Sequence, residues 1–345
     1  MTAAVSYGDI SPAVAAYSVV RMLTRGIPFL VLEKFGQTYP LPNNSTKTAK
    51  FRRYFLQGST GAAGSGDPTQ PFATALSVTP LLEGVTPAGK KLANQDYTAT
   101  LAQYGDYITI TDVILDTHTD PVLQQATDIL GESAAQTIET LRFNVLKGGV
   151  NVFWSNGGVR TAVNTPISTT LQRQITTALT RQNAKRITSV LKSTPDFRTE
   201  PVEAAFIALC HPDLETDIRS MSGFIPTKQY GTVTPFENEI GSVETCRYLQ
   251  STIFAPWTDV GGAKGAMRST TGTNADVYPI LYLGRDAFGI VPLKGKDSLT
   301  PMVVNPKPAA GDPLAQRGTV GWKAMTTTVI LNDAWMARAE VAATA

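Results

Sequence analysis

Residues 120–149 read DPVLQQATDILGESAAQTIETLRFNVLKGG, and this stretch predicts the longest helix of the chain. Asp120 is a good N-cap and Pro121 is tolerated at the first helical position, while the Gly148–Gly149 pair supplies a stop. Between these limits, apolar residues recur at steps of three and four: Val122, Ala126, Ile129, Leu130, Ile138, Leu141 and Val145. A helix over 121–147 would be about 40 Å long at 1.5 Å per residue. It exceeds the average globular helix and suits a structural spine.

The chain before this helix reads as extended structure. Residues 1–46 contain Pro28, Pro40 and Pro42, which break regular structure, so we expect an arm that is ordered only by lying across something else. Residues 47–57 predict a strand, a Gly-rich tip follows at 58–66, and residues 92–115 alternate as strands do. Since exposed strand edges invite pairing, we expect this long β excursion to be covered by a neighbouring subunit.

The chain after the helix reads as mixed α/β. We expect a helix over 167–191, with Leu171, Ile175, Ala178, Leu179 and Ile187 on one side. A short helix is expected over 213–221. Strands are expected over 150–154, 204–210, 277–283, 288–293 and 320–342. The predicted fold class is therefore α+β.

Composition excludes several classes of protein. Only 17% of the 345 residues are charged, against about 25% in an average protein, and 45 threonines favour strands. No apolar stretch is long enough to span a membrane, and the first 30 residues do not resemble a secretory signal. With two cysteines and two histidines, the chain is poorly supplied for disulfides, metal sites or acid–base chemistry.

The net charge of +2 conceals alternating blocks along the chain. Residues 1–60 carry a balance of +5, residues 90–150 of −4, residues 160–200 of +5 and residues 201–260 of −5. One interpretation is chance together with solvated faces. The other is a modular protein whose blocks meet oppositely charged blocks on other copies of itself, which would fix the register of assembly.

No motif predicts catalysis, a cofactor or a metal. The Gly58–Gly66 stretch lacks the Lys-Ser/Thr ending of a phosphate loop. Cys210 and His211 are neighbours at the end of a predicted strand, so their side chains point to opposite faces. The acidic residues Glu237, Glu239 and Glu244 could bind a cation, but a solvated acidic face is the simpler interpretation. We therefore expect no enzyme, no cofactor and no metal site.

Several segments, taken in order, resemble the major capsid proteins of tailed bacteriophages, in the branch typified by the N4-type virions. They are Val31-Leu-Glu-Lys-Phe-Gly-Gln37, Thr48-Ala-Lys-Phe-Arg-Arg53, Leu82-Glu-Gly-Val-Thr-Pro87, Tyr104-Gly-Asp-Tyr-Ile-Thr-Ile-Thr-Asp112, residues 141–156 and the closing stretch 320–340. The resemblance implies a Hong Kong 97-like capsid fold. By implication 1–46 is the N-terminal arm, 47–116 the extended loop, 117–160 with 319–345 the peripheral domain carrying the spine helix, and 161–318 the axial domain.

The resemblance also implies a function and partners. The chain would form pentamers and hexamers of an icosahedral head around double-stranded DNA. It would reside in the virion shell after assembly in the bacterial host cytoplasm. Expected partners are many copies of itself, a portal protein, possible scaffolding and decoration proteins, and packaged DNA by non-specific proximity, with no membrane. The alternatives are a phage tail-tube or surface-layer type protein, and a β-rich hydrolase or binding module.

Charged residues of the predicted loop are the candidates for contacts between subunits. They are Lys50, Arg52, Arg53, Glu83, Lys90 and Lys91. We expect their partners in the acidic blocks 90–150 and 201–260 or the basic blocks of adjacent subunits. Some relatives join a loop Lys to an Asn of another copy by an isopeptide bond. Lys90 and Lys91, with Asn144, Asn151 and Asn156, could supply such a pair, but these residue types are common and we expect no crosslink.

Overall fold

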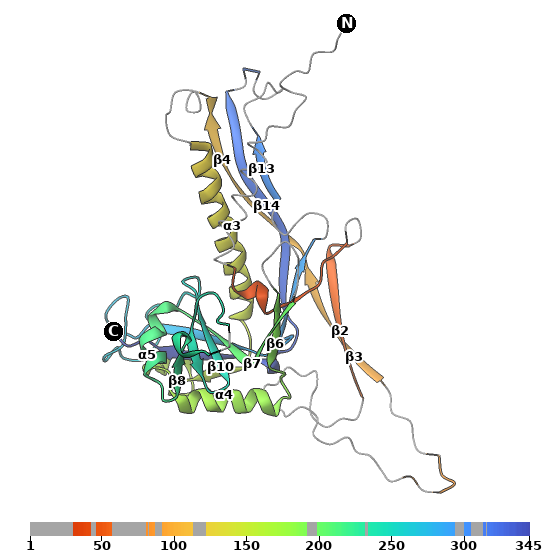
Figure 1. The fold of residues 1–345 in the computed structure, drawn as a ribbon, viewed down its shortest axis with the longest axis vertical. Coiled ribbons are helices and arrows are strands. Elements are labelled where there is room, and N and C mark those ends of the chain that lie inside the picture. The colour runs from red at the N-terminus through yellow and green to blue at the C-terminus, as the bar shows by residue number, and fades with distance from the viewer. Residues whose placement is uncertain are drawn as a thin grey trace.

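The computed structural model describes residues 30–42, 46–56, 81, 83–86, 92–112, 122–191, 199–231, 234–293, 300–304, 313–314 and 316–345. The molecule is elongated, with a long helix and long strands extending from a body of shorter elements (Figure 1). A two-stranded hairpin extends in another direction from the place where these two parts meet. Among the described residues, no helix combines the length and apolarity that crossing a membrane requires.

The longest helix among the described residues is α3 (Val122–Leu146), which confirms the helix predicted over 121–147. It lies along a sheet formed by β4 (Ala102–Thr111), β12 (Phe288–Pro292), β13 (Thr300–Val304) and β14 (Arg317–Ile330), with β1 (Gln37–Thr38) at its edge. β4 pairs with β14 from Ala102↔Thr326 to Thr111↔Arg317. Residues 102–111, which we expected within the extended loop, therefore lie beside the spine helix.

The apolar side of α3 differs from the predicted stripe. Ala126, Leu130, Ala134 and Ile138 are spaced four apart and pack against β4 and β14. Two members of the predicted stripe, Ile129 and Val145, are instead exposed, and Leu141 is half-buried. The prediction was wrong at these positions because small alanines occupy much of the buried face. Alanines allow the helix to approach the sheet closely. A search for large apolar residues passes over Ala134.

The body contains an eight-stranded sheet. Its strands are, in spatial order, β5 (Val152–Trp154), β15 (Met336–Ala342), β11 (Val277–Leu283), β7 (Thr199–Cys210), β10 (Cys246–Gln250), β9 (Glu239–Val243) and β8 (Phe224–Pro226), with β6 (Ile187–Leu191) paired to β7. All residues of β11 and β15 are buried, as expected of strands covered on both faces. β15, expected with the peripheral domain, therefore lies inside this sheet.

One face of this sheet is covered by α4 (Thr169–Arg181) and α5 (Glu215–Ser220). The other face packs against the end of α3, through Phe143 and Leu146, and against Leu32. The prediction of one helix over 167–191 was wrong at its C-terminal end, because α4 stops at Arg181 and Ile187 begins a strand. Asn183 adopts a positive φ of 54°, a backbone conformation that ends helices, and the β-branched residues that follow favour extended structure.

The hairpin consists of β2 (Thr48–Leu56) and β3 (Leu92–Thr100). In the described part of the chain these strands pair only with each other, and the hairpin extends away from the body (Figure 1). Its base is held by Ala49, Ala99 and Leu101, which pack with Val291 and Leu41. The predicted glycine-rich tip at 58–66 lies outside the described residues, as do Asp120 and Pro121.

Candidate functional site

The residues considered for chemistry serve the fold. Cys210 is fully buried and its Sγ donates to the Leu249 carbonyl oxygen at 3.4 Å. Burial raises the pKa of this thiol, which makes it a poor nucleophile. His211 Nδ1 accepts a hydrogen bond from the Asp213 backbone N–H at 3.2 Å. Among the described residues, no group of His, Cys, Asp or Glu could hold a metal ion.

The three acidic residues Glu237, Glu239 and Glu244 do not converge, because each faces a different cation. Glu237 Oε2 pairs with Lys34 Nζ at 2.5 Å. Glu244 Oε1 pairs with Arg173 Nη2 at 2.5 Å, and the buried Glu239 pairs with Arg247 at 2.6 Å. Glu237 and Glu244 join distant segments of the chain, whereas Glu239 and Arg247 lie on the neighbouring strands β9 and β10.

The charge blocks of the sequence therefore meet inside one chain to a large extent. Arg52 of the first basic block faces Asp96 of the first acidic block, and Lys34 of the same block faces Glu237 of the second acidic block. Arg173 of the second basic block faces Glu244. Ion pairs within one chain thus account for part of the alternation of charge.

The candidate contact residues lie on the hairpin or beyond the described residues. Arg52 makes two hydrogen bonds to Asp96 across the strand pair, Nε–Oδ1 at 2.7 Å and Nη2–Oδ2 at 2.9 Å. These bonds lower the pKa of the Asp96 carboxyl. Lys50 is exposed on β2, and Glu83 is exposed in a turn completed by Gly84, whose φ is +77°. The Arg53 side chain, Lys90 and Lys91 lie outside the described part of the chain.

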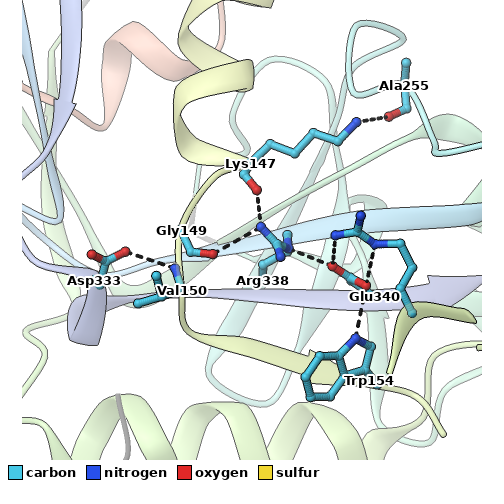
Figure 2. A network of polar contacts seen from close by, with 9 residues as sticks. Lys147, Gly149, Val150, Trp154, Ala255, Asp333, Arg338 and Glu340 are labelled. Carbon is cyan, nitrogen blue, oxygen red and sulfur yellow. Dashed lines mark hydrogen bonds and ion pairs between the residues drawn. The ribbon is translucent and has the colours of Figure 1, made fainter. Parts of the chain in front are cut away.

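The strongest polar cluster joins the end of α3 to the eight-stranded sheet (Figure 2). The Arg338 guanidinium on β15 donates to the carbonyl oxygens of Lys147 and Gly149, the latter at 3.1 Å. Lys147 and Gly149 follow directly on the last residue of α3, Leu146, at the helix end that carries partial negative charge. Arg338 thereby ties the turn after α3 to β15, the strand next to the sheet edge β5, and we call this cluster the junction.

Glu340 completes the junction. Its side chain is 1% exposed, and it accepts hydrogen bonds from Arg338 Nε at 2.9 Å, from Arg160 Nη2 at 2.7 Å and from Trp154 Nε1 at 3.1 Å. The Arg160 guanidinium also lies 3.7 Å from the ring centroid of Trp257, a cation–π contact. The buried carboxylate thus has two cationic partners and an indole N–H donor, which offset the cost of burying its charge.

A second buried carboxylate fixes the segment that precedes β1. Glu139 on α3 accepts the backbone N–H groups of Val31 at 3.0 Å and Leu32 at 2.7 Å. Arg142, one helical turn further, pairs with Glu33 Oε2 at 3.2 Å and lies 3.7 Å from Glu139 Oε2. Burial raises the pKa of Glu139 to about 7, although Arg142 and the two N–H donors act in the other direction.

Sequence reasoning missed both clusters. The available signals were a charged pair spaced two apart in an otherwise apolar closing strand, Arg338 and Glu340, and a charged pair spaced three apart in the spine helix, Glu139 and Arg142. Two charges on one buried face require partners. The sequence alone could not indicate that those partners are carbonyl groups and an indole from other elements.

Comparisons with known proteins agree on one family. The sequence profile described as phage capsid protein matches residues 94–339, which include α3 and almost all of both sheets except β1. No curated protein matches the chain in sequence.

Among solved structures, the capsid of Ralstonia phage GP4 is similar with a TM-score of 0.63 at 11% identity, over 91% of each chain. The head structure of Helicobacter pylori bacteriophage KHP40 follows with a TM-score of 0.57 at 11% identity, over 90% of this chain and 88% of that one. The capsid of cyanophage P-SCSP1u has a TM-score of 0.56 at 14% identity, over 91% of this chain and 88% of that one.

Proposed function

The chain belongs to the phage capsid protein family, and from that premise we propose that it is the major capsid protein of a tailed phage, with a Hong Kong 97-like fold of the N4-type branch. In this proposal it assembles as pentamers and hexamers into an icosahedral head that encloses double-stranded DNA. The observation that carries the proposal is the similarity in fold to phage capsids over about nine tenths of the chain.

The architecture supports a role in assembly. The hairpin β2–β3 extends from the body, and a projecting strand pair gains stability when another chain covers it. The outer face of the long sheet carries exposed apolar residues, Tyr107 at 69% exposure, Met302 and Val304. They line a groove of about 420 Å³ with Gly321 and Lys323. Exposed apolar residues around a groove are typical of contact surfaces.

We assign the parts of the fold on the same premise. Residues 1–46 are the N-terminal arm, the hairpin β2–β3 is the extended loop, and α3 is the spine helix. We place β4 with the peripheral domain because it pairs with β14, and β15 with the axial domain because it pairs with β11. A portal protein, scaffolding and decoration proteins, and assembly in the host cytoplasm follow from the premise as further proposals.

Electron microscopy of the expressed protein tests the proposal. We expect closed shells of uniform diameter after purification in negative stain. Open tubes with helical order would contradict it and favour the tail-tube alternative. Monomers that never assemble, under conditions in which the chain is folded by circular dichroism, would also contradict a self-sufficient shell protein.

A further inference from the structure

Four basic side chains gather at one corner of the body. Arg181 ends α4, Lys185 and Arg186 lie in the connection to β6, and Arg285 lies in the turn between β11 and β12. The two turns are adjacent, since the backbone N–H of Arg285 donates to the Lys185 carbonyl oxygen at 2.8 Å. All four side chains are exposed. We call this group the basic corner.

Three of the four cations of this corner face no carboxylate in the described part of the chain. Arg181, Lys185 and Arg186 have no ion pair in the described part of the chain. Arg285 Nε lies 3.5 Å from its neighbour Asp286. Three other arginines of the body, Arg173, Arg219 and Arg268, each face a carboxylate. A cation at a helix C-terminus is favourable in itself, which accounts for Arg181, but the other three side chains lie beyond the helix.

The described surface offers no matching acidic patch on a second copy. Several carboxylates of the acidic blocks already face cations of their own chain, as Glu237 and Glu244 do. Exposed acidic residues without a cationic partner, such as Glu83, Asp106 and Glu203, lie on different elements: the 83–84 turn, β4 and β7. A partner with closely spaced negative charges fits the corner better than another subunit does, and the phosphate backbone of a duplex has that spacing.

We propose that the basic corner contacts the phosphates of double-stranded DNA and, resting on the proposed function, that it faces the inside of the shell. Few contacts per subunit make the interaction weak and strongly dependent on salt, because each neutralised phosphate releases about one counterion. Such contacts favour the position of DNA next to the inner surface of the shell but are too weak to prevent its release. Arginines that face a carboxylate of their own chain, such as Arg173 and Arg268, add little to this attraction.

The test compares unassembled subunits and closed shells with a fluorescent 30-base-pair duplex of mixed sequence. Anisotropy is measured from about 50 to 200 mM salt. The triple variant Arg181→Gln, Lys185→Gln and Arg186→Gln should bind the duplex at least tenfold more weakly at low salt, with a salt slope smaller by about 2 to 3. The control variant Arg219→Gln, Lys228→Gln and Lys264→Gln loses the same charge from separate elements and should bind like the unsubstituted chain.

Each part of the proposal can fail separately. Equal losses in the two triple variants would show that binding follows net charge and would overturn the assignment to the corner. Closed shells that bind external duplex as well as free subunits would overturn the inward orientation. Loss of shell formation in the corner variant, with unchanged affinity for the duplex, would mean that the partner is another subunit. Shell formation is scored independently by microscopy. The proposed function is therefore tested separately from the binding of DNA to the basic corner.

Discussion

Glu340 is a buried carboxylate whose neighbours are two guanidinium groups and an indole N–H. Replacing it by alanine leaves Arg338 and Arg160 facing each other without a counter-charge. We expect Glu340→Ala to lower the free energy of unfolding by about 3–5 kcal/mol, measured by urea denaturation of the unassembled subunit. The control is Glu203→Ala on the exposed face of β7, which should change it by less than about 0.5 kcal/mol. Equal effects would mean that the junction contributes no more than a surface charge.

Glu139 makes the stability of the subunit depend on pH. Its pKa in the folded chain is about 7, above the ordinary 4.5, so the protonated carboxyl is favoured by folding. This contribution is fully present below about pH 4.5 and is lost as the pH rises through 7. The Gln side chain of Glu139→Gln keeps an oxygen that can accept hydrogen bonds from the Val31 and Leu32 N–H groups. This side chain cannot ionise. The free energy of unfolding of Glu139→Gln, taken relative to that of the unsubstituted chain, should therefore increase between pH 5 and 8. The increase should be on the order of 3 kcal/mol.

The comparison needs both proteins measured at each pH, because other groups titrate in the same range. A difference between the two curves that stays constant from pH 5 to 8 would contradict the raised pKa. A proteolysis assay adds a local readout: cleavage near residues 31–35 should become faster in the unsubstituted chain as the pH rises above 7, and should change less in Glu139→Gln.

At the scale of elements, α3 offers a matched pair of neighbouring residues. Leu130 is 2% exposed against the long sheet, whereas Ile129 is 59% exposed. Leu130→Asp buries an unpaired charge and should cost several kcal/mol, giving insoluble or unfolded protein. Ile129→Asp should change stability by less than about 0.5 kcal/mol. Soluble expression and thermal unfolding of both variants check this. If both variants were equally tolerated, α3 could not be packed as the structure has it.

The hairpin offers a second prediction, on Arg52. Its ion pair with Asp96 is exposed, and such pairs contribute only about 0–1 kcal/mol. We expect Arg52→Glu to leave the subunit folded and to impair shell formation, since it places like charges opposite each other on a projecting element. Light scattering follows assembly, and circular dichroism follows folding.

The charge-swapped double variant Arg52→Glu with Asp96→Arg separates two roles of this arginine. The internal pair predicts that the swap restores shells. If the swap folds but does not assemble, Arg52 contacts a group on another copy, as the sequence led us to expect. The intersubunit role of Lys50, Arg52, Arg53, Glu83, Lys90 and Lys91 stays a prediction until such variants are measured.

Most elements could be predicted from local patterns of residues. The predictions that were wrong share a physical cause. The long helix, the buried strand ending at Cys210 and the closing strands are confirmed because their periodicity extends over many residues. The end of α4 and the buried face of α3 were wrong because they depend on a single positive φ at Asn183 and on close packing of alanines. The junction could not be predicted at all, since its members come from four separate segments.

At the scale of the whole molecule, the projecting hairpin separates folding from assembly. Its base packs on β12 through Val291, and none of the described body elements packs against its far end in Figure 1. We expect deletion of residues 58–66 to leave the melting temperature of the subunit nearly unchanged and to abolish normal shells. Negative-stain images of the deletion variant, beside those of the full chain, decide the matter. Normal shells would show that assembly does not depend on this tip.

The contact that Arg338 makes with the turn after α3 also has a mechanical consequence. A force applied along the helix passes through the carbonyls of Lys147 and Gly149 into β15, which is hydrogen-bonded on both sides within the broad sheet. We therefore expect α3 and the eight-stranded sheet to tilt together as one rigid unit. We expect β14 to be most compliant beyond Thr326, where β4 no longer pairs with it and β12 is its described partner strand. If copies of this chain change their curvature as a wall, the bend will be concentrated there.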